Sequence, residues 1–406
     1  MKDVQSIALL GNMNNNNNAL TRYLRDRNYD AKLFLFEHEL DHFLPQNDQY
    51  DSSYTAYTDH ISWGSYSSLF LTRASTIEAT LKRFDYTIGA RLTPAYFARI
   101  GCKLDLFIPT GSDLCSLPFF NGFSPKRLLQ FSLVAALQRR GIAQASCMLW
   151  DATNTTVEAR IQKLSLPKDR IRAGIPALYL PDYDPAVLAR HQSQSIYFDR
   201  FKAIREKHRY MVFHHIRHVW KQPSIDALGQ FHAKSNDALL HGFAKFRQAQ
   251  PQANSCLVLF DYGPDVQASK ELCLQLGIAD CVYWFPLMPR KELMYGLAMS
   301  DVMVGELKNS WLSYGSIFEA MAVKVPIIHH RTDSLYTHQK ELYPMFDAFS
   351  ADSVFESLRA LYLDKAMAKR IGEQAYEWFS REVINKPLDS ICERIDQKFA
   401  AASRRA

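Results

Sequence analysis

The second half of the sequence carries two cations that could bind one anion. Arg217 lies in the segment His214–Trp220, which ends a candidate strand, and Lys234 precedes Asp237 at the start of a candidate helix. Arginine offers a planar fork of N–H donors, lysine a point charge, and a helix N-terminus free backbone N–H groups. The pattern predicts that Arg217 and Lys234 converge on a single anion.

Three histidines beside Arg217 raise the alternative of a metal site. His214, His215 and His218 cannot all face one way on an extended strand end, because side chains alternate there. No carboxylate lies at a useful spacing from them. We therefore expect no bound metal.

A carboxylate further along could bind a polyol. Glu319 lies within Gly315–Ala322, where a glycine turn and a helix start are followed by the apolar strand Val325–His329. A carboxylate in a first helical turn can accept hydrogen bonds from both hydroxyls of a ribose. Alternatively, Glu319 only stabilises the helix N-terminus.

An asparagine-rich loop separates the first candidate strand from the first candidate helix. Gly11 permits a tight turn, and Asn12, Asn14 and Asn15 tolerate left-handed backbone and offer amide groups to hydroxyls. Open parallel sheets bind ligands at such strand ends. The alternative is a polar loop that caps the helix. The loop is not GxGxxG, so it does not indicate NAD.

A second loop of the first half, Pro109–Leu114, combines small residues with a carboxylate. Ser112 and Asp113 could hydrogen-bond a sugar or a phosphate that approaches closely. The alternative is a turn in which Asp113 caps the following segment.

Apolar runs alternate with helical patterns along the chain, which is typical of βαβ units around parallel sheets. The predicted strands are Ile7–Leu10, Ala31–Phe36, Tyr86–Gly89, Leu106–Pro109, Cys147–Leu149, Tyr210–His214, Cys256–Phe260, Cys281–Phe285, Val302–Gly305 and Val325–His329. The predicted helices are Ala19–Arg27, Asp237–Ala249, Val266–Leu276, Arg290–Met299 and Ser316–Ala322.

Three further segments have weaker patterns. Asn47–Tyr66 predicts a long loop with little regular structure. Prolines and aspartates in Leu178–Arg200 predict a linker free of helix and strand. Met367–Phe399 predicts two helices broken near Pro387.

Composition excludes several classes of protein. The 406 residues, 47% of them hydrophobic, predict two globular domains, with no apolar run of membrane-spanning length. The N-terminus lacks the features of a signal peptide, and seven dispersed cysteines without CxxC spacing favour reduced thiols in a cytoplasmic protein. A net charge of +6 without a dense basic patch suits an anionic ligand or contact with an acidic membrane surface, and does not suggest nucleic acid.

Taken together, these segments resemble glycosyltransferase family 4 and its relatives of the GT-B fold. The similarity is most specific over "HHIRHVW…AKSNDALLHGFAKF", "LGIADCVYWFPLMPRKELMYGLAMSDVMV" and "FEAMAVKVPII". The first-half segments "GNMNNNNNALTRYLRDRNYDAKLFLF" and "PTGSDL" resemble the family's N-terminal loops.

The resemblance implies an α/β fold of the GT-B type. Two Rossmann-like domains would face each other across a cleft, with C-terminal helices crossing back to the first domain. The implied domains are residues 1–190 on the acceptor side, 191–375 on the nucleotide-sugar donor side, and 376–406 as the returning helices.

The resemblance also implies roles for individual residues. Arg217 and Lys234 would neutralise the donor diphosphate and, with Asp113, form the catalytic set. The remaining donor-binding residues would be Gly11, Asn12, Leu287, Met288, Ser316 and Glu319. The acceptor-binding residues would be Asn14, Asn15, Ser112 and Asp113.

One departure from the family pattern concerns the donor sugar. The family often has two glutamates separated by seven residues, the first of which contacts this sugar. Trp311 stands at that first position before Glu319. The nearest upstream carboxylate, Glu306, is out of register.

The implied reaction moves a sugar from a nucleotide-diphosphate donor to a hydroxyl with retention, without a metal or a cofactor. The acceptor would be a glycan, a lipid-linked or another hydroxyl compound in polysaccharide or glycoconjugate synthesis, at a cytoplasmic site compatible with peripheral contact to the inner membrane face. Two alternatives stay open: a non-catalytic nucleotide-sugar-binding protein, and a GT-B-fold sugar-nucleotide epimerase.

Overall fold

The chain divides into two compact units, described from a computed structural model. The structure describes residues 5–119, 125–150, 158, 161–221, 233–337 and 339–404. Unit 1 combines Met1–Tyr179 with Arg381–Ala406, and unit 2 spans Leu180–Ser380. The chain therefore passes from one unit to the other between residues 179 and 180 and again between residues 380 and 381. The predicted boundaries follow residues 190 and 375.

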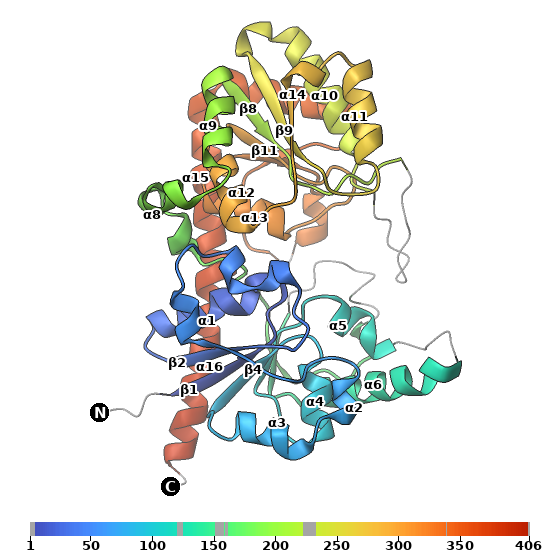
Figure 1. Cartoon of the computed structure of the whole chain (residues 1–406), viewed down its shortest axis with the longest axis vertical. Helices are drawn as coiled ribbons and strands as arrows, with labels where there is room; N and C mark the ends of the chain where they lie inside the picture. The colour runs from blue at the N-terminus through green and yellow to red at the C-terminus, as the bar shows by residue number, and fades with distance from the viewer. Residues whose placement is uncertain are drawn as a thin grey trace. The chain divides into compact units, whose positions relative to one another are not determined.

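Unit 1 is built on a seven-stranded sheet in which every neighbouring pair is parallel, in the order β3-β2-β1-β4-β5-β6-β7 (Figure 1). The strands are β1 (Ser6–Leu10), β2 (Asp30–Leu35), β3 (Thr58–His60), β4 (Tyr86–Gly89), β5 (Leu106–Phe107), β6 (Cys147–Leu149) and β7 (Asp169–Ile171). Because the strands are parallel, their carboxyl ends share one edge, where loops can bring polar groups together.

The helices of unit 1 are α1 (Asn16–Asp26), α2 (Ser68–Leu71), α3 (Ala74–Leu81), α4 (Thr93–Arg99), α5 (Ser112–Cys115), α6 (Pro125–Gln144) and the C-terminal α16 (Lys386–Ser403). α1 and α16 pack together on one face of the sheet, where Leu20, Leu388 and Ile391 join Ile7 and Leu9 in a buried cluster. The C-terminal helix is therefore part of the core of the N-terminal unit, as the GT-B fold implies.

Unit 2 contains a six-stranded parallel sheet in the order β10-β9-β8-β11-β12-β13. Its strands are β8 (Tyr210–Phe213), β9 (Ser255–Phe260), β10 (Val282–Phe285), β11 (Val302–Val304), β12 (Ile327–His329) and β13 (Phe346–Asp347). All ten predicted strands occur in the two sheets, with ends within two residues of the predicted ones. The strands β3, β7 and β13 were not predicted.

Helices cover both faces of the unit 2 sheet. They are α8 (Pro185–His191), α9 (Phe198–Lys207), α10 (Asn236–Ala249), α11 (Val266–Gln275), α12 (Arg290–Ala298), α13 (Gly315–Ala322), α14 (Ala351–Leu363) and α15 (Lys365–Trp378). Along β8, Val212 packs in one core cluster with Phe243 of α10, whereas Phe213 faces Phe201 of α9 across 6.2 Å. This alternation follows from the two-residue period of a strand.

Three predicted segments differ from the structure. The predicted loop Asn47–Tyr66 contains β3, whose register against β2 is set by pairs such as Leu33 with Thr58. The predicted linker contains α8, because Asp184 caps this helix by accepting from the Ala186 N–H and a proline suits its first turn. The interruption near Pro387 is a π-helical stretch, Phe379–Asn385, between α15 and α16. No helix in the described ranges is long and apolar enough to cross a membrane.

Candidate functional site

The loop that follows β8 is held by a buried imidazole–amide network. His214 donates from Nδ1 to the Val304 carbonyl at 2.7 Å, and its Nε2 lies 2.9 Å from Asn236 Nδ2. Burial and the nearby His218 ring lower the pKa of His214 to about 3, so the imidazole is neutral and Nε2 accepts from the amide. His214 thus fixes the first residue of α10 beside the end of β8.

The start of α10 is joined to the same loop. Asn236 Oδ1 accepts from the Val219 N–H at 3.0 Å, and the Lys234 N–H donates to the Val219 carbonyl at 2.7 Å. Between them, Ser235 has the left-handed φ of 53°, a conformation that costs free energy and persists only where its surroundings hold it. The helix N-terminus and Lys234 are therefore presented together at the strand end.

Lys234 forms a buried ion pair. Its Nζ lies 2.5 Å from Glu306 Oε1, and the two side chains are only 14% and 11% exposed. Glu306 Oε2 accepts from the Trp311 indole N–H at 2.9 Å, and the Glu306 N–H donates to the Tyr314 hydroxyl at 2.9 Å. A lysine ammonium has three N–H donors, so this pair leaves two for a ligand.

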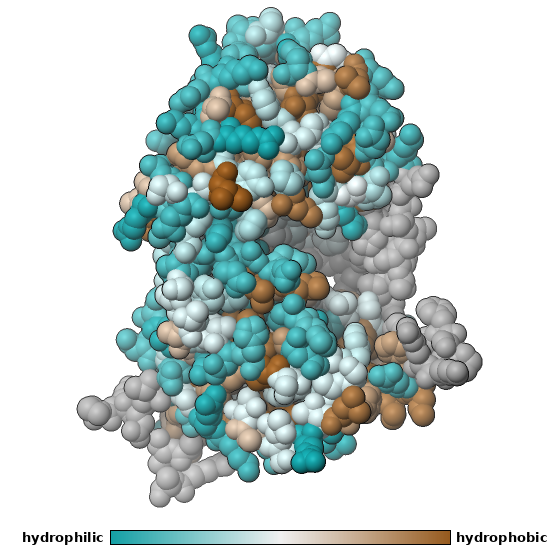
Figure 2. Space-filling view, in the orientation of Figure 1, coloured by the Kyte–Doolittle hydropathy of each residue, from teal (hydrophilic) through white to brown (hydrophobic). Residues whose placement is uncertain are grey.

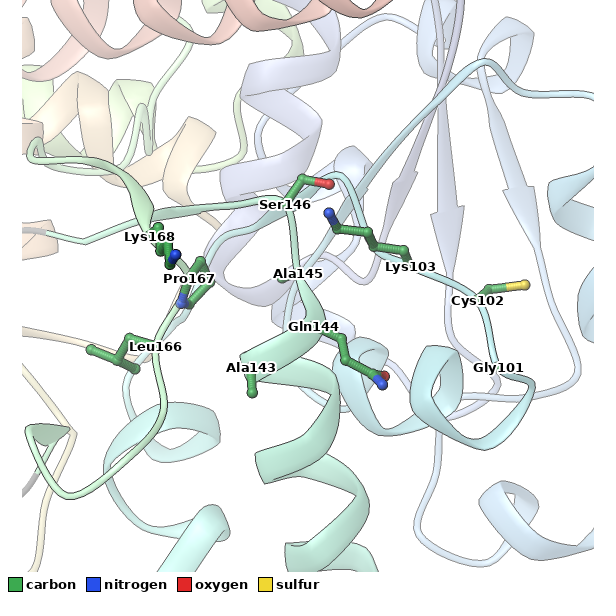
Figure 3. Close-up of a pocket in the computed structure, with 10 residues that line it drawn as sticks. All are labelled: Gly101, Cys102, Lys103, Ala143, Gln144, Ala145, Ser146, Leu166, Pro167 and Lys168. Carbon is green, nitrogen blue, oxygen red and sulfur yellow. The ribbon is translucent and has the colours of Figure 1, made fainter.

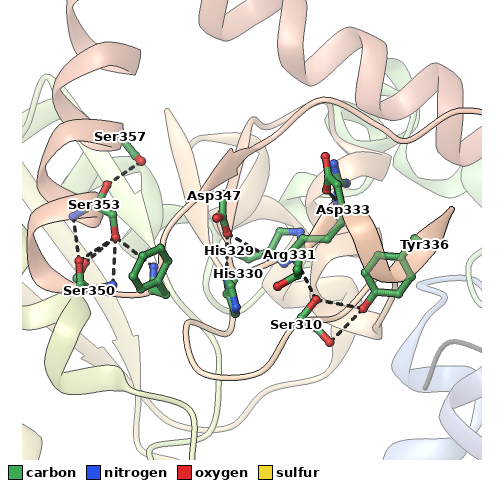
Figure 4. Close-up of polar contacts among 12 residues, drawn as sticks. Ser310, His329, His330, Arg331, Asp333, Tyr336, Asp347, Ser350, Ser353 and Ser357 are labelled. Atoms are coloured by element: carbon green, nitrogen blue, oxygen red, sulfur yellow. Dashed lines mark hydrogen bonds and ion pairs between the residues drawn. The ribbon is translucent and has the colours of Figure 1, made fainter. Parts of the chain in front are cut away.

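The segment that carries Trp311 is fixed from the far side by residues that follow β12 (Figure 4). The Ser310 hydroxyl accepts from the Thr332 N–H at 2.8 Å, and the Tyr336 hydroxyl donates to the Ser310 carbonyl at 3.0 Å. Arg331 in turn pairs with Asp333 at 2.7 Å. These contacts hold the loop between β11 and α13 and so set the position of Trp311.

Glu319 forms a second buried cluster of charge. Its Oε2 accepts from His215 Nε2 at 2.8 Å and its Oε1 from Arg290 Nε at 2.8 Å. Burial by itself would raise the pKa of Glu319, but the His215 hydrogen bond and the Arg290 charge outweigh it and lower the pKa to about 2. Glu319 is therefore ionised at neutral pH, and each oxygen keeps capacity for a further hydrogen bond.

Two groups beside these clusters lack partners. His215 Nδ1 is buried without a hydrogen bond, and Arg217 has no ionic or hydrogen-bonded partner within the described part of the chain. Buried polar atoms in folded proteins are nearly always paired, so an orphaned imidazole nitrogen beside an unpaired guanidinium indicates a place for a ligand. Both residues follow β8 directly.

In unit 1, polar groups from four strand ends meet at the carboxyl edge of the sheet. Asn12 follows β1, Glu39 follows β2, Arg91 follows β4 and Asp113 follows β5. The Asn12 N–H donates to Glu39 Oε1 at 3.0 Å, and Arg91 Nη1 lies 2.8 Å from Glu39 Oε2. The Arg91 N–H donates to Asp113 Oδ2 at 2.9 Å. These contacts connect the four loops in one network.

Asp113 is a buried carboxylate of this network. It accepts from the Thr110 N–H at 2.9 Å, from the Thr110 hydroxyl at 3.2 Å and from the Arg91 N–H. Burial raises the pKa of Asp113 to about 6, although these donors oppose the shift. The side chain thus holds two loops together, and its neighbour Ser112 is exposed.

The asparagine loop uses much of its hydrogen-bonding capacity internally. Asn12 Nδ2 lies 2.7 Å from Asn15 Oδ1, Asn12 Oδ1 accepts from the Asn18 N–H at 2.9 Å, and Asn15 Nδ2 lies 3.1 Å from Asp48 Oδ1. Asn14 and Asn15 have φ values of 53° and 59°, which confirms the expected left-handed backbone. Asn14 is exposed, whereas Asn12 and Asn15 are buried.

Gly11 makes this loop sterically feasible. It has φ +79°, and a Cβ atom there would lie 2.7 Å from the Phe36 ring. Any other residue would therefore be both strained and crowded.

The chain matches one protein family over part of its length. Residues 225–378 match the family model "Glycosyl transferases group 1", a region that contains Lys234, Arg290, Glu306 and Glu319. This region is a glycosyl transferases group 1 domain. A comparison with curated proteins gives no significant match.

Solved structures with the same fold include established members of the GT-B class. A glycosyltransferase from Rickettsia africae superposes with a TM-score of 0.60 at 14% identity, covering 98% of this chain and 99% of its own. Anabaena HepE, solved with UDP and glucose, gives 0.57 at 14% identity and coverage of 97% and 100%. A Neisseria meningitidis UDP-GlcNAc 2-epimerase gives 0.57 at 12% identity and the same coverage. The chain therefore has the GT-B fold, and its residues 225–378 match the glycosyl transferases group 1 model.

The structure places six of the eight predicted donor residues in unit 2 and two in unit 1. Arg217 and Lys234 flank the loop after β8, and Glu319 reaches the same loop through His215. Leu287, which is 62% exposed, and Met288 follow β10. Ser316 lies at the second position of α13, beside Gly315. Gly11 and Asn12 belong to unit 1, with the predicted acceptor residues.

Three residues of the unit 2 polar clusters were not among the predicted site residues. Arg290 was noticed only as the start of a helix, His215 only as a rejected metal ligand, and Glu306 only as a carboxylate out of register. Among the described residues, no group of three metal-capable side chains exists, and each histidine of HHIRH has a different surrounding. The signal for Arg290 was its place directly after a proline that begins a helix.

A further cavity of unit 1 lies away from the polar network. It has a volume of about 620 Å³ and is lined by Gly101–Lys103, Ala143–Ser146 and Leu166–Lys168 (Figure 3). These segments precede β5, β6 and β7, so the cavity lies at the amino-terminal edge of the sheet. Ligands of open parallel sheets bind at the opposite edge, and we assign this cavity no role in donor binding.

Proposed function

We propose that this chain transfers a hexosyl group from a nucleoside-diphosphate sugar to a hydroxyl acceptor, with retention of anomeric configuration. The observation that carries the proposal is that Arg217, which has no partner among the described residues, lies in the loop whose Val219 holds Lys234 and the N-terminus of α10. The Arg217 guanidinium, the Lys234 ammonium and a helix N-terminus suit a diphosphate, and the match to the glycosyl transferases group 1 model favours a nucleoside-diphosphate donor.

The remaining donor contacts follow from the surrounding groups. Glu319 would accept the ribose hydroxyls, since His215 and Arg290 hold its carboxylate ionised and oriented. Leu287 and Met288 would flank the base, and Ser316 would offer its hydroxyl at the start of α13. The contacts from unit 1 would come from Gly11 and Asn12.

In the proposed reaction, the bond between the anomeric carbon and the diphosphate oxygen breaks while a bond to the acceptor oxygen forms. Negative charge grows on the leaving diphosphate, whose oxygen takes the proton that the acceptor hydroxyl loses. Arg217 and Lys234 would stabilise that charge, which is the main catalytic contribution that fixed cations supply. Asn14, Asn15, Ser112 and Asp113 would contact the acceptor or the transferred sugar.

The acceptor would be a growing glycan or a lipid-linked compound in the cytoplasm, in the synthesis of cell-surface polysaccharide or glycoconjugate. UDP-glucose is the first donor to test, because Anabaena HepE was solved with UDP and glucose. UDP, GDP, CMP and ADP sugars can be compared by thermal shift, because a bound ligand raises the melting temperature by mass action.

Lys234→Ala tests the proposal directly. Loss of one charge aimed at the leaving group should lower transfer by about 100-fold or more, with far-ultraviolet circular dichroism unchanged. Lys308→Ala is the matched control, because Lys308 is exposed and follows Glu306 by only two residues. Wild-type turnover by Lys234→Ala would refute the assignment.

A sugar-nucleotide epimerase is the alternative that the fold alone supports, since the N. meningitidis epimerase superposes equally well. The match to glycosyl transferases group 1 favours transfer. Slow release of nucleotide from the donor without acceptor would exclude a pure binding protein, and formation of an epimeric nucleotide sugar without acceptor would favour the epimerase.

A further inference from the structure

Exposed apolar side chains gather at one place on unit 1. Thirteen large hydrophobic residues are exposed in the described part of the chain, and five of them fall in two short segments. These five, the α2–α6 patch, are Tyr66 (44% exposed), Phe70 (37%), Leu71 (80%), Leu129 (71%) and Leu133 (46%). Such a gathering on a folded surface usually marks an interaction site.

The two segments belong to one surface. The Tyr66 ring meets Phe131 of α6 at 5.9 Å between centroids. Brown residues accordingly cluster over α2 and α6 at the lower edge of the molecule in Figure 2. On α6, Leu129, Leu133 and the exposed Ala136 follow the i, i+4, i+7 spacing of a single helix face.

The turn that presents Phe70 and Leu71 is held by buried groups. The hydroxyl of the buried Tyr96 accepts from the Gly64 N–H at 2.9 Å and donates to the Ser65 carbonyl at 2.7 Å. The Trp63 ring, 1% exposed, packs on Tyr96 at 4.9 Å. The exposure of Leu71 is therefore a feature of an anchored turn and not of a frayed end.

The charges carried by the two segments of the patch all have one sign, although Glu37 from another element contacts Ser65 and Ser68. Neither residues 61–73 nor residues 129–144 contain an aspartate or a glutamate. Arg73, Arg139 and Arg140 in these segments are exposed, and Arg140 continues the helix face of Leu129 and Leu133. A second protein would need carboxylates opposite these arginines, whereas an anionic lipid surface offers both acyl chains and negative headgroups.

We propose that the α2–α6 patch binds unit 1 to the surface of an anionic lipid bilayer, with Leu71 and Leu129 entering the headgroup region and the three arginines contacting lipid phosphates. The inference does not depend on the proposed reaction, because no residue of the patch belongs to either polar site. It names the surface through which a transferase could meet a lipid-linked acceptor.

Co-sedimentation of the full chain with vesicles tests the proposal. Binding is expected to vesicles of phosphatidylcholine mixed with phosphatidylglycerol, and to be weak with phosphatidylcholine alone. The variant Leu71→Asp/Leu129→Asp should lose at least tenfold in vesicle affinity. The matched control Leu274→Asp/Leu363→Asp, at unit 2 positions that are 70% and 61% exposed, should bind like the wild type.

Two results would overturn the proposal. One is equal vesicle binding by the patch and control variants. The other is a concentration-dependent dimer, seen by sedimentation velocity, that only the patch variant loses while no vesicles bind, which would make the patch an interface between two copies. Donor-induced thermal shifts should be the same in both variants, so a failure of the proposed reaction is seen separately.

Discussion

The polar sites of unit 1 and unit 2 differ in how their charges are balanced. In unit 2, Glu319 and Glu306 each neutralise one cation, and Arg217 has no partner among the residues that the structure describes. In unit 1, the buried carboxylates of Glu39 and Asp113 are satisfied by Arg91 and by backbone N–H groups of the loops. The unit 2 site therefore suits the proposed anion, whereas the carboxylates of the unit 1 site hold its loops in place.

The difference shows which parts of each site a ligand must disturb. The proposed diphosphate would reach Arg217 without breaking a contact of the described residues, and it would compete with Glu306 for Lys234. An acceptor at the unit 1 edge meets groups that already bond to one another, so it must use remaining lone pairs or exposed side chains such as those of Asn14 and Ser112. Shape should therefore matter more there than charge.

The largest predicted effect comes from neutralising Glu319. Glu319→Gln leaves Arg290 without its counter-ion and turns an amide N–H₂ toward one of two donors, which is costly in a buried place. The folded pKa of about 2 lies below the ordinary 4.5, so the charge contributes about 3 kcal/mol of stability above pH 4.5. Thermal unfolding at pH 7 should show that the variant has a lower free energy of unfolding than the wild type by this amount. The difference should become smaller as the pH falls from 4.5 toward 2.

Glu356→Gln is the control for that comparison. Glu356 forms an exposed pair with Arg359, and such pairs contribute little to stability. A Glu319→Gln variant as stable as this control at pH 7 would show that Arg290 and His215 do not depend on the carboxylate.

Asp113 should show the reverse pH dependence. Its folded pKa of about 6 lies above the ordinary 3.8, so the folded state favours the protonated form, and stability from this group is lost as the pH rises from about 4 through 6. Asp113→Asn removes that loss. The variant's melting temperature relative to wild type should therefore rise over this range, by the equivalent of up to about 3 kcal/mol.

The same series separates a structural from an acceptor-binding role of Asp113. If the carboxylate only holds the turn at Thr110 and the loop at Arg91, the variant should keep the wild-type KM for the acceptor. If the difference in melting temperature between Asp113→Asn and the wild type stays constant from pH 4 to pH 7, the pKa of Asp113 is not raised in the folded protein.

Much of the fold could be predicted from the sequence because central parallel strands are continuous apolar runs between turn signals. Such runs identify β8 or β9 without reference to the rest of the chain. The short edge strands β3 and β13 could not be predicted, because they lack such runs and their pairing partners lie far away in the sequence. The sequence did not predict α8, because proline interrupts the interior of a helix. Pro185 instead lies in the first turn of α8, which proline suits.

The sequence predicted the site residues that lie in local patterns. It did not predict the residues whose role depends on pairing with another part of the chain. Arg217 and Lys234 could be selected because their positions at a strand end and a helix start are local patterns. The partners Arg290 and Glu306 could not, because their pairing depends on how α12, β11 and α13 pack in three dimensions. The asparagine loop showed its backbone conformation in advance but not which of its amides would turn inward.

The smallest predicted effect is that of Trp311→Phe on the KM for the donor. Its indole N–H is one of two described partners of the Glu306 carboxylate, and the other is Lys234. Trp311→Phe removes that donor while keeping a ring of similar shape, so Glu306 has only Lys234 to balance its charge. The ammonium should then be less available to the diphosphate, and the KM for the donor should rise roughly fivefold, the effect of about 1 kcal/mol from one hydrogen bond.

The double variant Trp311→Phe/Glu306→Gln decides between two explanations of that rise. If Glu306 competes with the donor for Lys234, neutralising the carboxylate should bring the KM back to or below the wild-type value. If Trp311 instead contacts the donor sugar, the raised KM should persist in the double variant. Because Ser310 and Tyr336 fix this segment from the far side, neither change should alter the melting temperature as much as Glu319→Gln does. Recovery would show that the site tolerates a tryptophan at this position because the neighbouring carboxylate regulates how strongly Lys234 holds the donor.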